Sequence, residues 1–161
     1  MMIQGFEMLS EEQFDVTKKA ITWITILIAG ADGEIEKEET EWAKKIAHIR
    51  SYHNPNELTP FYEEVGKDFS SILNNLLDQL PPGTNDRQEL LIRQLSKLNN
   101  ILPILDNNLG HLLLKSYRSF AKHVAKASGG FLGFLSVGKE EDKLIDLPML
   151  NDIPFVDTEV S

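Results

Sequence analysis

Four acidic side chains lie close together in a turn near the start of the chain, where they could supply oxygen ligands to a cation. They are Asp32, Glu34, Glu36 and Glu39. Carboxylate oxygens are preferred by hard cations such as Ca²⁺ and Mg²⁺, whereas Zn²⁺ more often takes Cys or His. We therefore treat these residues as a candidate divalent-cation site, with Ca²⁺ favoured over Zn²⁺. Such a site needs further carboxylates from elsewhere in the chain, or water.

Part of this spacing equals the second half of an EF-hand loop. Asp32 would take the fifth position of such a loop, Gly33 the sixth and Glu39 the twelfth. The first and third positions fall on Ile28 and Gly30, which have no side-chain oxygen. A complete EF-hand is therefore excluded, and a weaker cation site is what remains.

A second interpretation of the same acids needs no metal. Gly33 can take the positive φ of a turn between helices, and Ile35 can anchor that turn inward. Glu36 would then be the N-cap of the next helix and Glu39 its N3 residue, as in a capping box. Acids at this end of a helix each contribute about 0.3–1 kcal/mol through the helix dipole. Both interpretations remain open.

No other pattern in the chain indicates catalysis or a bound cofactor. The four histidines fall at no ligand spacing, and we expect surface or capping roles for them: His48, His53, His111 and His123. Nucleophile-elbow, P-loop and dinucleotide-binding motifs are missing. A hydrolase would also require a deep pocket enclosing paired carboxylates. We therefore predict a non-enzymatic protein without catalytic or cofactor-binding residues.

Composition narrows the class of protein further. The 161 residues suit one domain, and a net charge of −9 without a dense Lys/Arg cluster argues against nucleic-acid binding. The absence of cysteine excludes disulfides and thiolate metal sites. The longest apolar stretch, Ala20 to Ala31, is too short to span a bilayer, and Met1 to Ser10 does not resemble a signal peptide. We expect a soluble cytoplasmic protein.

Apolar residues recur at helical spacing through most of the chain, which predicts an all-α fold. We expect about six helices, arranged as helical hairpins around the first. Their approximate ranges are 11–31, 36–51, 59–80, 85–98, 106–128 and 139–146. Residues 1–146 would form one domain, and residues 147–161 an extended tail that is ordered where Leu147, Met149 and Leu150 touch the body.

Several local signals define the expected helix ends. Ser10 and Gln13 read as a capping box, and Thr59 followed by Pro60 reads as a cap with Pro at N1. Gly66 could break the third helix. Asn85 or Asp86 would cap the fourth, and Pro103 marks a kink or a new first turn. The first helix is apolar over most of its circumference, so it should be the central element.

The Gly/Phe-rich segment 129–138 is the second stretch of interest. It has too many glycines for a regular helix, yet it contains Phe131, Leu132, Phe134 and Leu135. These side chains either cover the open end of the helix array or form an apolar surface for a partner or a membrane interface. We favour the first interpretation.

A weak internal repeat links two parts of the chain. Residues 28–33 align with residues 124–129, and 37–39 align with 139–141 after an insertion of six residues. Two related helix-turn-helix halves would explain this. The second half has Ser128 in place of the turn Asp, so any cation site would be centred on the first half.

The turn from Ala29 to Glu39 resembles the Ala-x-Ala-Asp-Gly-x-Ile-x-x-x-Glu turn of the tellurite-resistance TerB-like family. The resemblance implies an all-helical single domain with an acidic surface and divalent-cation binding. It also implies a stress-response role, since related modules occur beside co-chaperone and stress-response domains. Asp32 and Glu39 match the family pattern, while Glu34 and Glu36 are added from their proximity.

Two functions therefore follow from the sequence. The first is a non-enzymatic TerB-like module that binds a divalent cation at the acidic turn and acts in stress or tellurite resistance. The second is a structural protein–protein interaction domain without metal, with a protein partner or a second copy bound through the 36–51 helix or the 129–138 segment.

Overall fold

The structure is a computed structural model, and it describes residues 3–30, 41, 43–45, 47–48, 57–129 and 144–156, with side chains omitted at 127–129. These residues form helices and irregular segments without a strand, which confirms the all-α class. The elements are α1 (Glu11–Ala29), α3 (Thr59–Gln79), α4 (Thr84–Ser96), the short 3-10 helices η1 (Lys97–Asn100) and η2 (Leu102–Ile104), and α5 (Asn107–Gly129).

The arrangement into six helices built from hairpins stays a prediction, because parts of the expected helices 36–51 and 139–146 lie outside the described residues. Within the former, residues 41, 43–45, 47 and 48 are helical. Ala43 and Ala47 are buried while Glu41 and Lys45 are exposed, as the amphipathic pattern indicates. Within the latter, Leu144 alone is helical among the described residues.

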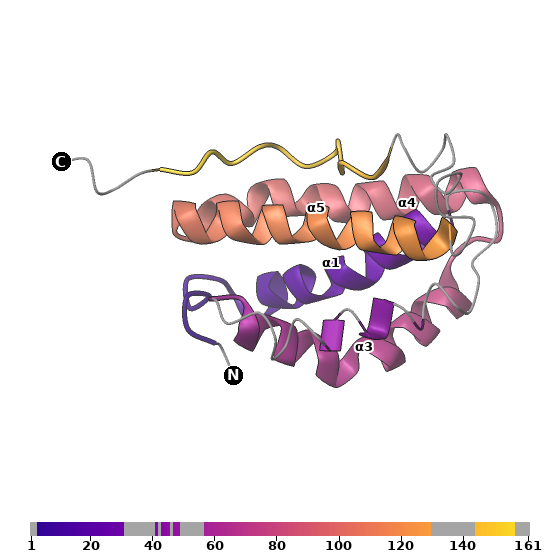
Figure 1. Ribbon diagram of the computed structural model, residues 1–161, viewed down its shortest axis with the longest axis horizontal. Helices are drawn as coiled ribbons and strands as arrows, with labels where there is room; N and C mark the ends of the chain where they lie inside the picture. The colour runs from indigo at the N-terminus through magenta and orange to yellow at the C-terminus, as the bar shows by residue number, and fades with distance from the viewer. Residues whose placement is uncertain are drawn as a thin grey trace.

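Helix α1 is the central element of the fold, as its sequence predicts. The Ser10 hydroxyl accepts a hydrogen bond from the Gln13 N–H (3.1 Å), and the Gln13 side chain accepts one from the Ser10 N–H (2.9 Å), so the expected capping box is present. From Ala20 to Ala29 every residue is buried. Helices α3, α4 and α5 all pack on α1 and together cover its apolar surface (Figure 1).

Two expected helix caps and one expected break are wrong. Thr59 lies inside α3, whose N-cap is Leu58, and the predicted caps of α4 lie inside that helix, which begins after Gly83. Prolines rather than side-chain caps set where the two helices begin. Pro60 lies in the first turn of α3, and Pro81–Pro82–Gly83 precedes α4. Helix α3 also continues through Gly66, where an added Cβ would meet no atom within 4 Å. A glycine in an open helix face weakens a helix but does not end it when the other face is buried.

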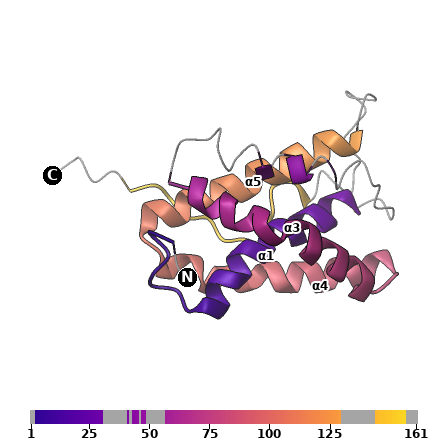
Figure 2. The ribbon, with the colours of Figure 1, turned by 90° about the horizontal axis from the view of Figure 1, so that it is seen from below.

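Helix α5 packs against α1 and runs in the same direction (Figures 1 and 2). Near their starts, a Cβ on Gly5 would lie 2.9 Å from Leu109, and further along Tyr117 donates a hydrogen bond to the carbonyl of Thr17 at 2.8 Å. Gly5 lies just before α1, so the start of α5 meets the segment before α1 and the middle of α5 meets α1 itself, as parallel helices require. Both views show the two helices ending on the same side of the molecule (Figures 1 and 2).

Aromatic side chains fill the core at the other end of α1. Phe6 stacks on Phe61 with ring centroids 5.5 Å apart and meets Phe14 edge to face at 5.4 Å. Phe61 in turn contacts the rings of Tyr62 and Tyr117 edge to face. Such pairs add about 0.5–1.5 kcal/mol each beyond the area that they bury. The N-terminal segment, α1, α3 and α5 therefore share one core.

The segment 144–156, which we call the C-terminal strap, runs beside α5 in the opposite direction (Figure 1). Leu147 and Leu150 are buried in the main core and Met149 packs against it, so the expected contacts of the tail are confirmed. Leu147 has a φ of 49°, which is unfavourable for a residue with a side chain. Its complete burial compensates for this backbone conformation.

None of the helices in the described ranges is long and apolar enough to cross a membrane.

The buried hydroxyl of Tyr117 makes stability depend on pH in the alkaline range. Burial, with a smaller contribution from Tyr62, raises the pKa of Tyr117 well above its usual value of about 10. A raised folded-state pKa stabilises the protein fully below the unfolded pKa, and this contribution is lost as the pH rises from about 10 towards the folded pKa.

We expect Tyr117→Phe to cost about 1 kcal/mol at pH 7, because the hydrogen bond to Thr17 is lost. Above about pH 10 the wild type should lose up to about 1.4 kcal/mol per pH unit more than the variant. Urea unfolding from pH 7 to 11.5 measures both. Parallel loss of stability in the two proteins would contradict the assignment to Tyr117.

Candidate functional site

The four predicted ligands Asp32, Glu34, Glu36 and Glu39 lie outside the described residues. The structure does describe the helix end to which their turn is attached. At that end the Gly30 N–H bonds to the carbonyls of Ile26 and Ile28, which closes the last turn of α1. The acidic turn therefore begins one residue after a buried and hydrogen-bonded backbone.

A buried arginine holds this end of α1. The Arg87 guanidinium donates a hydrogen bond from Nη2 to the carbonyl oxygen of Gly30 at 2.9 Å, and Arg87 is only 7 % exposed. Buried charges are usually paired, yet no carboxylate among the described residues contacts Arg87. A fixed positive charge therefore lies beside the point from which the acidic turn starts.

Arg87 was not among the residues predicted from the sequence, although the sequence contains a signal for it. Arg87, Leu91 and Leu95 follow one another at intervals of four on α4, and all three are buried. An arginine that continues an apolar helical stripe has to find its partners inside the protein. Here the partner is the C-terminal carbonyl of α1, which also benefits from a positive charge at that end of the helix.

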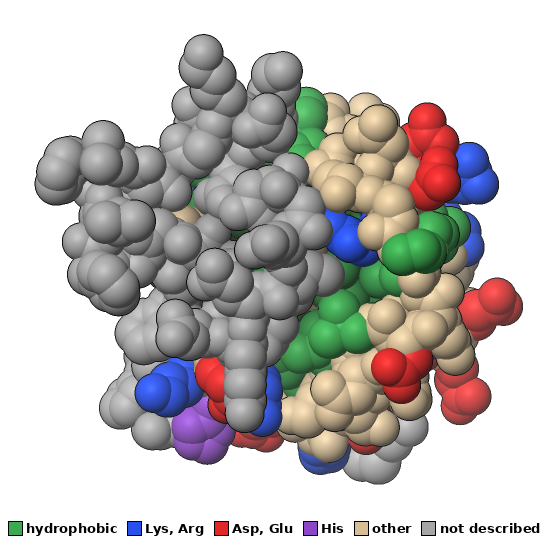
Figure 3. All heavy atoms as spheres, turned by 90° about the vertical axis from the view of Figure 1, so that its right-hand side faces the viewer, with side chains coloured by type: hydrophobic (Ala, Val, Ile, Leu, Met, Phe, Trp, Pro, Cys, Tyr) green, Lys and Arg blue, Asp and Glu red, His purple; other side chains and the backbone are tan. Residues whose placement is uncertain are grey.

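The parallel packing of α1 and α5 places the ends of both helices at the same end of the molecule, and the segment that follows each helix contains acidic residues. Segment 31–40 follows α1 and segment 130–143, with Glu140 and Glu141, follows α5. The two halves of the weak repeat thus leave the helices at the same end of the molecule. Figure 3 views this end, where hydrophobic side chains border the atoms that are not described and several acidic side chains lie towards the outer edge.

Elsewhere in the described ranges, no three His, Asp or Glu side chains come close enough to hold a metal ion. His48 and His123 are exposed, in agreement with the surface role expected for them, and His53 lies outside the described residues. The carboxylates of the described helices are mostly at the surface, as in the partly exposed pair Lys19–Asp15 at 2.9 Å.

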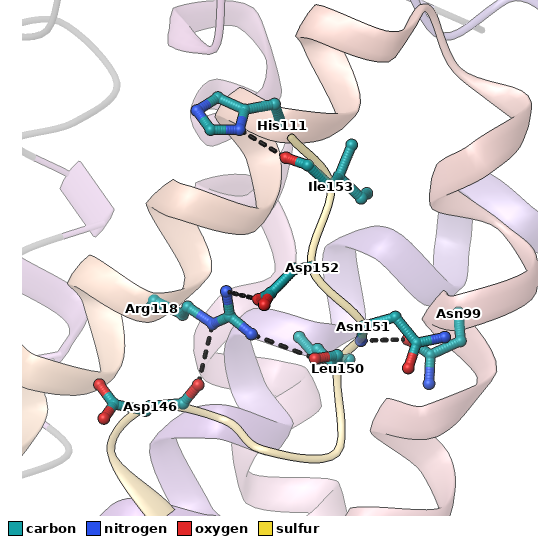
Figure 4. A network of polar contacts seen from close by, with 8 residues as sticks. All are labelled: Asn99, His111, Arg118, Asp146, Leu150, Asn151, Asp152 and Ile153. Atoms are coloured by element: carbon teal, nitrogen blue, oxygen red, sulfur yellow. Dashed lines mark hydrogen bonds and ion pairs between the residues drawn. The ribbon is translucent and has the colours of Figure 1, made fainter. Parts of the chain in front are cut away.

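A second polar constellation, which the sequence analysis missed, fixes the C-terminal strap (Figure 4). Arg118 of α5 donates from Nε to the carbonyl of Asp146 (2.8 Å) and from Nη2 to the carbonyl of Leu150 (3.1 Å). Its Nη1 bonds to the Asp152 carboxylate at 2.7 Å. One half-buried guanidinium therefore holds three points of the strap.

Two asparagine side chains each bind the strap through both of their polar atoms. Asn99 donates to the carbonyl of Met149 and accepts from the N–H of Asn151, at 2.9 and 2.8 Å. Asn108 makes the same pair of bonds with Val156, both at 2.9 Å. An amide side chain has one acceptor and two donors, so it can replace a neighbouring peptide group.

The remaining contacts involve the first turns of α5. His111 Nδ1 lies 2.6 Å from the carbonyl oxygen of Ile153, and the His111 ring meets Phe155 edge to face at 5.6 Å. Asn107 donates to the carbonyl of Pro154 at 2.8 Å. Most of these bonds involve backbone atoms of the strap, so α5 and η1 recognise an extended polypeptide largely independently of its side chains.

The chain matches no family model, and comparisons with curated proteins and with solved structures find no match either. The resemblance to the TerB-like family is thus carried by the eleven positions from Ala29 to Glu39.

Removal of the Arg87 guanidinium tests how firmly the end of α1 is held. We expect Arg87→Met to lower the free energy of unfolding by about 2 kcal/mol, since the bond from a charged donor to Gly30 is lost while the apolar stem is kept. Urea unfolding at pH 7 measures the change. Arg93→Met, on an exposed face of the same helix, is the matched control and should stay within about 0.5 kcal/mol of the wild type. An Arg87→Met protein as stable as the wild type would contradict the prediction.

Proposed function

We propose that this protein is a non-enzymatic TerB-like module that binds a divalent cation weakly through the acidic turn. Asp32, Glu34, Glu36 and Glu39 are the proposed ligands, and Ca²⁺ is the favoured ion because these ligands are hard oxygens. The proposed cellular role is in a stress response of the tellurite-resistance kind, as the resemblance implies.

The observation that carries this proposal is the parallel packing of α1 and α5. Residues 31–39 offer too few ligand positions for a complete EF-hand, so a cation site needs oxygen atoms from a second segment. Because both helices end at the same end of the molecule, segments 31–40 and 130–143 are attached there together. Glu140 and Glu141 are the carboxylates that we propose as the additional ligands.

Charge supports the same proposal. Segment 31–40 contains five acids and one lysine, which leaves a large negative excess next to a single buried arginine. Carboxylates held close together repel one another, and a bound cation relieves this repulsion. The rigid end of α1 restricts one side of the turn before any ion arrives, which lowers the ordering cost of binding.

The second candidate function is a protein-interaction domain without metal. Arg87 favours it, since a guanidinium beside Gly30 can neutralise the first acids of the turn in place of an ion. The other acids then cap the following helix. Under this alternative, a protein partner or a second copy of the chain is the ligand.

Thermal unfolding of chelator-treated protein distinguishes the two functions. Added Ca²⁺, Mg²⁺, Mn²⁺ or Zn²⁺ should raise the midpoint by mass action, by about 2.7 kcal/mol at a hundredfold excess over the dissociation constant. For a domain of this size that corresponds to roughly 5–10 °C. We expect the shift in the wild type, its loss in Asp32→Asn/Glu39→Gln and its reduction in Glu140→Gln/Glu141→Gln.

The matched control is Glu63→Gln/Asp68→Asn, which removes the same number of charges from the exposed face of α3. It should keep the full ion-dependent shift. If no ion raises the wild-type midpoint at millimolar concentration, cation binding is ruled out and the interaction-domain function takes its place. An equal shift in the turn variant and the wild type would place the ion elsewhere.

A further inference from the structure

An open groove of about 680 Å³ lies on α5 next to the strap. One wall is a face of α5 and the other is the distal part of the strap. The α5 side consists of His111, Leu114, Lys115, Arg118, Ser119 and Lys122. The strap side consists of Asp152, Ile153 and Pro154.

The groove is positively charged although the protein as a whole is acidic. Among the described residues that line it, Asp152 alone has a carboxylate, and Arg118 already pairs with it at 2.7 Å. Lys115 and Lys122 are exposed and form no ion pair with any described residue. These two lysines give the groove a local positive charge, although the chain has a net charge of −9. An anionic partner would complement this charge.

The strap shows what kind of chain this face of α5 can hold. It is extended, contains Asp146 and Asp152 without any Lys or Arg, and is bound mainly through its backbone. The groove continues the same surface, with buried Leu114 and partly buried Ile153 among its lining residues. An acidic and partly apolar extended segment therefore matches the positive charge of the α5 wall and the apolar side chains of Leu114 and Ile153.

We propose that this groove binds an extended acidic segment of a partner polypeptide, whose carboxylates pair with Lys115 and Lys122. The two lysines are seven residues apart on α5, which corresponds to about 10 Å along the helix. An extended chain advances about 3.3 Å per residue, so the two carboxylates should be two to four positions apart. The apolar residues of the segment would lie against Leu114 and Ile153. This site is independent of cation binding at the turn.

Selection of peptides from a random display library on the full-length protein tests the proposal without knowledge of the partner. We expect the enriched peptides to carry Asp or Glu at this spacing. Fluorescence anisotropy with the best labelled peptide should give an affinity that falls about tenfold or more in Lys115→Glu/Lys122→Glu. The affinity should also fall as the salt concentration rises to about 0.5 M.

The matched control is Arg93→Glu/Lys97→Glu, which makes the same charge change on exposed residues of α4 and η1 outside the groove. It should bind the peptide within about twofold of the wild type. If charge reversal disturbs the strap, Lys115→Ala/Lys122→Ala replaces it as the test variant. This variant should have the thermal midpoint of the wild type and should also bind the peptide more weakly.

Three results would overturn the proposal. One is a library without enrichment, or with peptides that lack acidic residues. Another is an affinity for the peptide that is unchanged in both groove variants. If Asn107→Ala/Asn108→Ala then abolishes binding, the peptide takes the place of the strap, because these two asparagines hold the strap. The third is a concentration-dependent dimer of the full-length protein that Lys115→Glu/Lys122→Glu dissociates, because the occupant would then be a second copy.

Discussion

The whole structure depends on the burial of a helix that is apolar on nearly every side. A helix with one apolar stripe needs a single packing partner, whereas α1 needs neighbours all around it. Helices α3, α4 and α5 supply them. Because such packing excludes water from residues 20–29 of α1, buried hydroxyl groups there must be satisfied locally, and Thr25 does this by donating a bond to the carbonyl of Ile21 at 2.9 Å.

The same constraint explains why Arg87 and Tyr117 are inside the protein. Each places an apolar body against α1 and directs its polar atoms to a backbone carbonyl of that helix, at Gly30 and Thr17 respectively. These bonds fix the position of α1 along its axis relative to α4 and α5. The end of α1, and with it the start of the acidic turn, is therefore determined by interactions that are distant in the sequence.

Helix α5 connects the two surfaces to which we assign binding. Its buried face follows α1 to the end that bears both acidic segments, and its outer face holds the strap and the basic groove. Charge thus differs between the two surfaces, with five acids in segment 31–40 and, on α5, Lys115 and Lys122, which pair with no acid among the residues that the structure describes. The two ligands that we propose, a cation and an acidic polypeptide, would therefore not compete for one surface.

The sequence alone determined the all-α class, the central position of α1 and the capping box at Ser10, because helical periodicity and capping depend on residues within a few positions of one another. It also indicated that Leu147 and Leu150 would touch the body. The caps of α3 and α4 were wrongly predicted because buried faces and prolines, rather than side-chain caps, set where those helices begin.

Only the tertiary structure showed that α1 and α5 are parallel, that Arg87 holds Gly30, and that Arg118 and the asparagines bind the strap. These contacts join residues about 30 to 100 positions apart, and local pattern carries no information about which distant helix faces meet. The physical reason is that apolar burial is not directional, so many arrangements bury the same stripes. Shape and a few long-range hydrogen bonds then select one arrangement among them.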